Sequence, residues 1–189
     1  MTHFDKIYSL EDQIAQLNHE LSRTRKEAAG GDVVDYAFDG WDGPTSLGAL
    51  FQGKSSLIVI HNMGGGCRYC SMWADGIAPL LPQLEQVAAV AMINHDPVAE
   101  QRATAAQRGW PFVMASAANS GFTADMGFTE PGDGSLRPGT STFTRAGDGT
   151  IRRNDFAYFG PHDKFCATYS FLELLPEEAV KSFEPLGVS

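Results

Sequence analysis

Two apolar runs with a helical pattern between them constrain the fold of this chain more than any other feature. Leu57–Ile60 and Val87–Ile93 contain no polar residue, which is typical of strands buried on both faces of a parallel sheet. Large side chains recur at helical spacing between the two runs, at Trp73, Ile77, Leu80 and Leu84. Parallel neighbours need a crossover of this kind. The sequence therefore predicts a strand, helix, strand unit at the centre of the fold.

A further helix and strand follow the second run. Asp96 predicts an N-cap, Pro97 suits the first helical position, and Gly109 predicts the end of the helix. Residues 110–114 then predict a short strand.

The last third of the chain adds a hairpin and a helix. Residues 140–145 and 150–156 predict two antiparallel strands around the turn sequence at 146–149. A final helix is expected between an N-cap at Asp163 and a stop at Pro176. Together these elements predict one α/β domain, a mixed sheet flanked by helices on both faces, over residues 31–180.

Residues 1–30 form a helical extension in this reading, with a helix over residues 10–29. Ser9 and Asp12 suit a capping box, and Gly30 ends the pattern. Apolar side chains recur at spacings of three and four, at Ile7, Leu10, Ile14, Leu17 and Leu21. We expect this stripe to pack on the body of its own domain. The alternative is a homodimer contact through the N-terminal helix.

Charge and composition exclude several classes of protein. The 14 Lys and Arg against 23 Asp and Glu give a net charge of -9, which argues against general binding to nucleic acid or to an anionic membrane. The chain starts with acidic residues where a signal peptide needs a basic and then an apolar stretch, so we expect a cytoplasmic protein. Three cysteines in 189 residues are no disulfide scaffold.

The pair Cys67 and Cys70 follows the first apolar run and opens the crossover helix. Gly64–Gly66 lets the backbone turn sharply before it. A thiol in the first helical turn meets unpaired amide N–H groups and the positive end of the helix dipole, which favours its thiolate form. Arg68 adds a positive charge. The spacing predicts a redox-active dithiol in which Cys67 attacks a disulfide and Cys70 resolves the intermediate.

This hypothesis implies a thiol–disulfide oxidoreductase without a cofactor or metal. Its partners would be a protein or small-molecule disulfide and a thiol or flavoprotein reductant. The alternative is a non-enzymatic binding module of the same fold, with a structural zinc site formed by Cys67, Cys70, His162 and Cys166. Inert core thiols are a third reading.

Several strings of residues resemble the bacterial thioredoxin-like family catalogued as domain of unknown function 899. The most specific is Cys-Arg-Tyr-Cys-Ser-Met-Trp-Ala-Asp-Gly at 67–76. The others are Asp-Tyr-Ala-Phe-Asp-Gly from 35, Leu-Ile-Val-Ile-His-Asn-Met from 57, Arg-Gly-Trp-Pro-Phe from 108 and the segment 165–176. The resemblance covers nearly the whole length. It implies a thioredoxin-like fold of the peroxiredoxin-like variant, with Cys67 exposed and Cys70 as its partner.

The chain departs from better-known thioredoxin-like proteins around the dithiol. Gly66 stands where a thioredoxin has tryptophan, and Gly64 stands where a peroxiredoxin has threonine, so peroxidase activity is the weaker expectation. Pro138 is the best match to the cis-proline that faces the dithiol in such folds. With Arg68 and Tyr69 it completes the predicted substrate-binding residues.

Four residues are candidates for ancillary roles. His61 could exchange protons with Cys70, or be hydrogen-bonded at the end of its strand. Trp73 is expected in the core, and Asp75 is either a buried proton acceptor or a helix-end residue. Cys166 could resolve a disulfide, although a small buried hydrophobe is the expected role.

Overall fold

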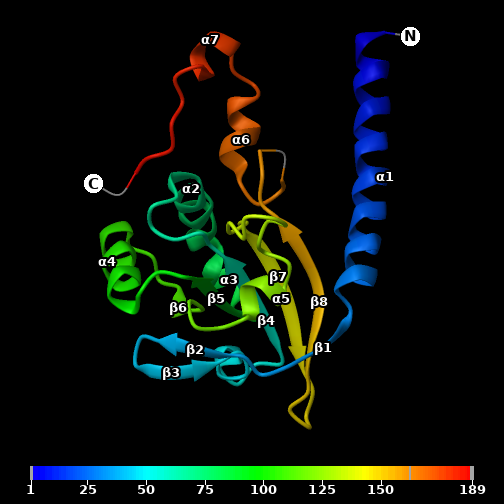
Figure 1. The fold of residues 1–189 in the computed structure, drawn as a ribbon. Coiled ribbons are helices and arrows are strands. Elements are labelled where there is room, and N and C mark those ends of the chain that lie inside the picture. Colours follow the sequence, from blue (N-terminus) through cyan, green and yellow to red (C-terminus); the bar gives the residue numbers. More distant parts are fainter. Residues whose placement is uncertain (1, 162, 188–189) are drawn as a thin grey trace.

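The computed structural model describes residues 2–161 and 163–187, and this part of the chain contains an eight-stranded mixed sheet (Figure 1). The strands lie in the order β1-β8-β7-β4-β5-β6-β2-β3. Their bounds are β1 Gly31–Val33, β2 Ala37–Gly40, β3 Gly43–Ser46, β4 Ser56–His61, β5 Ala89–Asn94, β6 Val113–Ser116, β7 Gly139–Arg145 and β8 Ile151–Tyr158. The central strands β4, β5 and β6 are parallel, and the other neighbours are antiparallel. The predicted parallel pair and the predicted hairpin are both confirmed.

Helices cover the two faces of this sheet, which confirms the predicted fold class. The helices are α1 His3–Ala29, α2 Arg68–Ile77, α3 Leu81–Leu84, α4 Val98–Arg108, α5 Phe122–Asp125, α6 Ala167–Leu172 and α7 Glu177–Val180, with 3-10 turns η1 Ala49–Phe51 and η2 Ala78–Leu80. No helix in the described part of the chain is both long and apolar enough to cross a membrane.

Alternation along the central strands divides the interior into two cores. On β4, Leu57 and Val59 point to one face, where they join side chains from η1, α5 and the loop around Phe128. Ile60 points to the other face, where it packs in one core with Trp73 of α2 and Ala105 of α4. The dithiol helix α2 therefore belongs to only one of the two cores.

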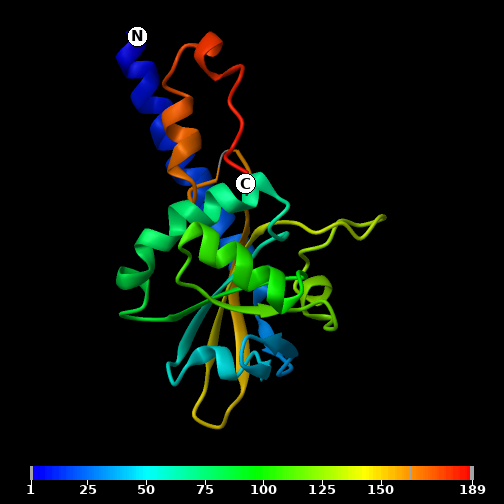
Figure 2. The same cartoon turned by 90° about the vertical axis from the view of Figure 1, so that its left-hand side faces the viewer.

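The N-terminal helix differs from the prediction in its start and in its packing. It starts at His3, because Thr2 and Asp5 form the capping box that was expected at Ser9 and Asp12. The apolar stripe is exposed rather than packed on its own domain. Figures 1 and 2 show why: α1 and the α6–α7 segment project beyond the same end of the sheet.

Two predicted caps are also corrected. Pro97 is the N-cap of α4, because the Asp96 carboxylate accepts a hydrogen bond from the Gly65 amide instead. Cys166 is the N-cap of α6, while the carboxylate of Asp163 accepts the amides just before the helix. In both places a carboxylate near a helix start serves a tertiary contact or a loop.

Candidate functional site

The dithiol lies at the start of α2, just beyond the carboxyl end of β4. Cys67 is the N-cap, with extended backbone, and its Sγ accepts a hydrogen bond from the Cys70 amide at 3.2 Å. Cys67 is half-buried and Cys70 is 3% exposed, and both thiols are free. The predicted nucleophile is thus the accessible thiol of the pair, and its predicted partner lies beneath it.

The two thiols are electronically unequal. A hydrogen bond from the Cys70 thiol, assisted by the amides of Cys70 and Tyr69, lowers the pKa of Cys67 to about 6 against the opposing effect of burial. The same hydrogen bond, burial and the charge of Cys67 raise the pKa of Cys70. At neutral pH the pair therefore holds a thiolate at Cys67 and a proton on Cys70.

Polar side chains fix the glycine loop that precedes the dithiol. Gly64 has a φ of +105°, which favours glycine, and its amide donates to the Asn62 side chain at 2.7 Å. The Gly65 amide donates to Asp96 Oδ2 at 2.7 Å. The Cys67 amide closes the turn on the Gly64 carbonyl at 3.1 Å. Asn62 and Asp96 thus hold the backbone that aims Cys67.

Asp96 belongs to a hydrogen-bonded chain that runs to the far edge of the sheet. Asn94 donates from Nδ2 to Asp96 at 3.2 Å and accepts from Gln101 at 2.6 Å. Gln101, fully buried on α4, accepts in turn from the Trp41 ring nitrogen at 3.2 Å. Sequence reasoning missed this network. Its signal was the polar Asn94 and Asp96 directly after a buried parallel strand, where such side chains meet the end of the neighbouring strand.

The start of α6 is anchored on the dithiol helix α2. Trp73 is buried, stacks on Phe159 and donates from its ring nitrogen to Asp163 Oδ2 at 2.8 Å. Asp163 also accepts the amide of Cys166 at 3.2 Å. Cys166 is buried in the same core as Trp73, as expected for a small hydrophobe. Burial raises the pKa of Tyr169 of α6, and the nearby side chains of Tyr69 and Cys67 add to this effect.

The predicted substrate-binding residues differ in their surroundings. Tyr69 is 49% exposed beside Cys67. Arg68 forms an ion pair with Glu184 at 2.9 Å on the protein surface. Pro138 directly precedes β7, whose first residue, Gly139, pairs with His61. No peptide bond between described residues is cis, so Pro138 does not supply the cis-proline that the resemblance implies. Docking of substrate at these residues stays a prediction.

His61 and Asp75 are not positioned to serve the dithiol. His61 points to the sheet face opposite α2, where its ring stacks on Phe128 and its Nε2 lies 3.0 Å from Ser141 Oγ. Burial, with the nearby charge of Arg153, holds the pKa of His61 well below its usual value. Proton exchange with Cys70 is therefore ruled out by the register of β4.

Asp75 instead binds two side chains, one from the end of α4 and one from the loop between α4 and β6. Its carboxylate contacts Arg108 at 2.7 Å and accepts from the Trp110 ring nitrogen at 2.7 Å. Its side chain is 43% exposed, so the expectation of a buried proton acceptor is wrong. The helix-end reading is the one that matches these contacts.

The described residues contain no assembled zinc site of the kind that the alternative interpretation requires. No group of three or more His, Cys, Asp or Glu residues there is arranged to hold a metal ion. Cys67, Cys70 and Cys166 therefore do not converge as three ligands. His162, the remaining candidate ligand, lies outside the described residues.

Comparison with known proteins gives a family and a fold. The family described as "Bacterial protein of unknown function (DUF899)" matches residues 4–181. No curated protein matches the sequence. Among solved structures, the peroxidoxin BcpB of Mycobacterium tuberculosis is 20% identical with a TM-score of 0.55, covering 79% of this chain and 98% of that one.

Two further solved structures are similar in the same way. Peroxiredoxin Q of Xanthomonas campestris is 17% identical with a TM-score of 0.54, covering 72% of this chain and 85% of that one. A cysteine-to-serine mutant of PrxQ from Xylella fastidiosa is 14% identical with a TM-score of 0.55, covering 76% of this chain and 91% of that one. At these identities the likeness establishes a thioredoxin-like fold of the peroxiredoxin kind and leaves the reaction open.

Proposed function

Because the chain belongs to the bacterial protein family of unknown function DUF899, a description that names no reaction, we propose its function from the site itself. The chain is a thiol–disulfide oxidoreductase in which Cys67 is the nucleophile and Cys70 the resolving thiol. The observation that carries this proposal is the half-buried Cys67 sulfur at the N-cap of α2, which accepts the Cys70 amide and has the buried Cys70 as its partner.

The reaction proceeds in two exchanges. The Cys67 thiolate attacks one sulfur of a substrate disulfide, the substrate S–S bond breaks, and the leaving thiolate takes up a proton. Cys70 then loses its proton and attacks the Cys67 sulfur, which forms the Cys67–Cys70 disulfide and releases the second substrate thiolate. The substrate gains two electrons and the protein dithiol loses them. A dithiol reductant restores the protein for the next turnover.

The difference in pKa between Cys67 and Cys70 suits this order of events. A thiol with a pKa near 6 is ionised at neutral pH and attacks without a general base. Cys70 keeps its proton while Cys67 carries charge, because that charge is one cause of its raised pKa. Formation of the mixed disulfide removes the charge, so the pKa of Cys70 falls at the step in which it must attack.

Surroundings of the dithiol favour a disulfide over a hydroperoxide as the oxidant. A hydroxyl donor three residues before the reactive cysteine is absent, because that residue is Gly64. A Cβ at Gly64 would lie 2.5 Å from Asp96 Oδ1, so the carboxylate fills the space that a threonine side chain needs. Exposed Tyr69 and Met63 beside the dithiol offer an apolar rim for an organic or peptide disulfide.

The experiment that tests the proposal uses three single variants of the full chain. Insulin reduction driven by dithiothreitol should be lost in Cys67→Ser and retained in Cys166→Ser, the matched control for removal of a thiol. Cys70→Ser should accumulate a mixed disulfide with the substrate. The same proteins are assayed with cumene hydroperoxide as the competing oxidant.

Three outcomes would contradict the proposal. Unchanged insulin reduction in Cys67→Ser would show that Cys67 is not the nucleophile. Faster turnover of the hydroperoxide than of disulfides would make the chain a peroxidase. About one zinc per chain in protein purified without chelator, with all thiols protected from alkylation, would instead support the non-enzymatic binding module.

A further inference from the structure

An exposed apolar seam follows the projecting helix α1. Ile7, Leu10, Ile14, Leu17 and Leu21 are 47%, 46%, 59%, 64% and 45% exposed. Their spacing alternates between three and four residues over two heptads, so they occupy the a and d positions of a coiled coil. The five aliphatic side chains keep to these two positions, as in the narrow seam of a helix pair, and the exposed aromatic side chains Phe4 and Tyr8 lie beside its N-terminal end. The body of the chain leaves this seam uncovered.

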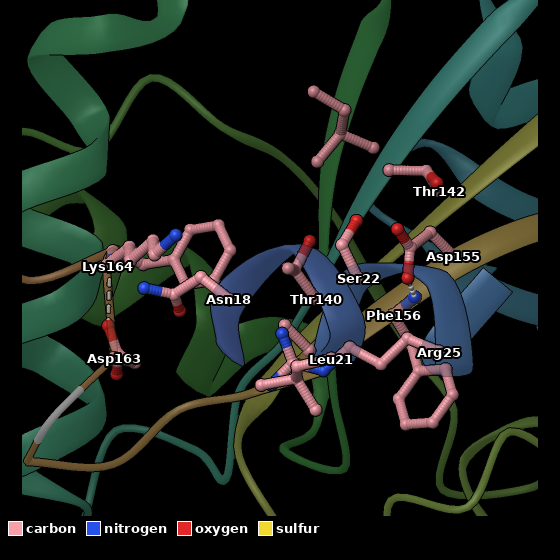
Figure 3. A pocket seen from close by; sticks show the side chains of 13 residues that line it. Asn18, Leu21, Ser22, Arg25, Thr140, Thr142, Asp155, Phe156, Asp163 and Lys164 are labelled. Carbon is pink, nitrogen blue, oxygen red and sulfur yellow. Dashed lines mark hydrogen bonds between the residues drawn. The ribbon is translucent and has the colours of Figure 1, made fainter. Parts of the chain in front are cut away.

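A different side of α1 contacts the domain and fixes the helix. Asn18, Ser22 and Arg25 are half-buried and Ala29 is buried, all one turn apart on one side. Asn18, Leu21, Ser22 and Arg25 line a cavity of about 360 Å³ between α1 and strands β7 and β8 (Figure 3). Because the domain anchors α1 in this way, a partner helix would meet a preformed seam and would not bear the cost of helix nucleation.

Charges beside the seam indicate which helix would match it. In a parallel pair, each g residue faces the e residue five positions later in the other helix. Lys6 then faces Glu11 of a second copy, and both side chains are exposed. This pairing is between opposite charges, and it occurs twice in a two-fold dimer. The helix is therefore complementary to itself in the parallel orientation.

The residue types in the seam also favour a parallel pair of helices. Isoleucine occupies a at Ile7 and Ile14, and leucine occupies d at Leu10 and Leu17. This distribution favours parallel two-stranded coiled coils over higher oligomers. Thr2 caps the helix and Gly30 ends it, so the seam lies wholly within one continuous helix.

We propose that α1 is a homodimerisation helix that pairs in parallel with α1 of a second copy of this chain. The juxtaposition that carries the proposal is an uncovered a/d seam on an anchored helix, flanked by self-complementary charges. Because the seam spans little more than two heptads, the dimer is reversible and dissociates on dilution. The proposal is independent of the chemistry at Cys67.

Sedimentation velocity of the full chain over a dilution series tests the seam. The parent protein should sediment as a dimer at high concentration and as a monomer after dilution. Leu17→Glu places a charge in the seam, and it should weaken association by more than about tenfold. Gln16→Glu is the matched control, since it adds the same charge to an exposed residue outside the seam. This variant should dimerise like the parent.

Exchange of two charges tests the orientation. Lys6→Glu and Glu11→Lys should each weaken the dimer, because each places like charges opposite one another, and the double variant should restore it. Far-UV circular dichroism and alkylation of Cys67 check that each variant is folded. A parent that is monomeric throughout, a Leu17→Glu protein that dimerises like Gln16→Glu, or a double variant that restores nothing would each overturn the proposal.

Discussion

Removal of the Cys70 thiol should make Cys67 a weaker acid. In the structure the Cys70 side chain is the largest cause of the low Cys67 pKa, ahead of the backbone amides of Cys70 and Tyr69. Cys70→Ala deletes that donor and leaves the N-cap hydrogen bond from the Cys70 amide in place. Cys70→Ser keeps a hydroxyl donor at nearly the same position. The two variants therefore separate loss of the hydrogen bond from loss of the second thiol.

The size of the effect follows from the strength of one hydrogen bond to a charged sulfur. Such a bond contributes about 1.5–3 kcal/mol, and about 1.4 kcal/mol corresponds to a tenfold change in ionisation. The titration midpoint of Cys67 should therefore rise by about one to two pH units in Cys70→Ala. At pH near 6, where the parent is about half ionised, the thiolate fraction of this variant falls to about 1–10%. A more basic thiolate is intrinsically more nucleophilic, which offsets part of the loss in rate.

The assay is the pH dependence of iodoacetamide alkylation at Cys67, followed by mass spectrometry of the peptide that contains it. The midpoint of the profile is the quantity compared, since it is insensitive to the intrinsic nucleophilicity. Cys70→Ser should keep a midpoint close to that of the parent. Equal midpoints for the parent and Cys70→Ala would refute the reasoning, because the low pKa would then come from the helix terminus alone.

Three further perturbations test features outside the dithiol. Burial holds the pKa of His61 well below its usual 6.5, so between about pH 7 and 5 the unfolded chain takes up a proton that the folded chain does not, and the free energy of unfolding falls with pH. His61→Gln should flatten this decline when the free energy of unfolding is measured in urea over the same pH range. Gly139→Ala should cost about 2 kcal/mol or more, because its Cβ would overlap the β8 backbone and a phenylalanine ring, whereas Gly147→Ala meets nothing within 4 Å and should stay within about 0.5 kcal/mol in the same assay. Asp96→Ala leaves a loop amide without its acceptor and should cost about 1–3 kcal/mol in thermal unfolding, and it should also slow alkylation of Cys67. A pH profile unchanged in the histidine variant, equal costs for the two glycine variants, or an unaltered alkylation rate would contradict the respective argument.

Elements defined by local patterns were predictable from the sequence. The apolar run at 57–60 lies in β4, the run at 87–93 overlaps β5, which starts two residues later at Ala89, and the hairpin pattern around 146–149 lies between β7 and β8. The spacing of Cys67 and Cys70 also placed the dithiol at the start of α2. These features depend on residues within one element or across one turn, where periodicity and turn chemistry act directly.

Contacts between distant segments were not predictable in the same way. The local sequence at Asp96 fits an N-cap, and its preference for the Gly65 amide depends on β4 and β5 lying side by side. His61 follows an apolar run toward the dithiol in sequence, yet the alternation of β4 turns it to the opposite face. A carboxylate or an imidazole forms hydrogen bonds with whichever groups the fold brings near it, so its role depends on how the elements pack.

The sequence by itself determined the parallel pairing of β4 and β5, the position of the dithiol, and a helix with an a/d stripe before the domain. Only the tertiary structure decided that Cys70 lies buried beneath Cys67, that Asp96 holds the loop before them, and that the α1 stripe is uncovered. The physical reason is the distance along the chain over which each interaction acts. Periodicity and capping act over a few residues and are written in the local sequence, whereas burial, hydrogen bonding and the pKa of a thiol depend on groups that only the folded chain assembles.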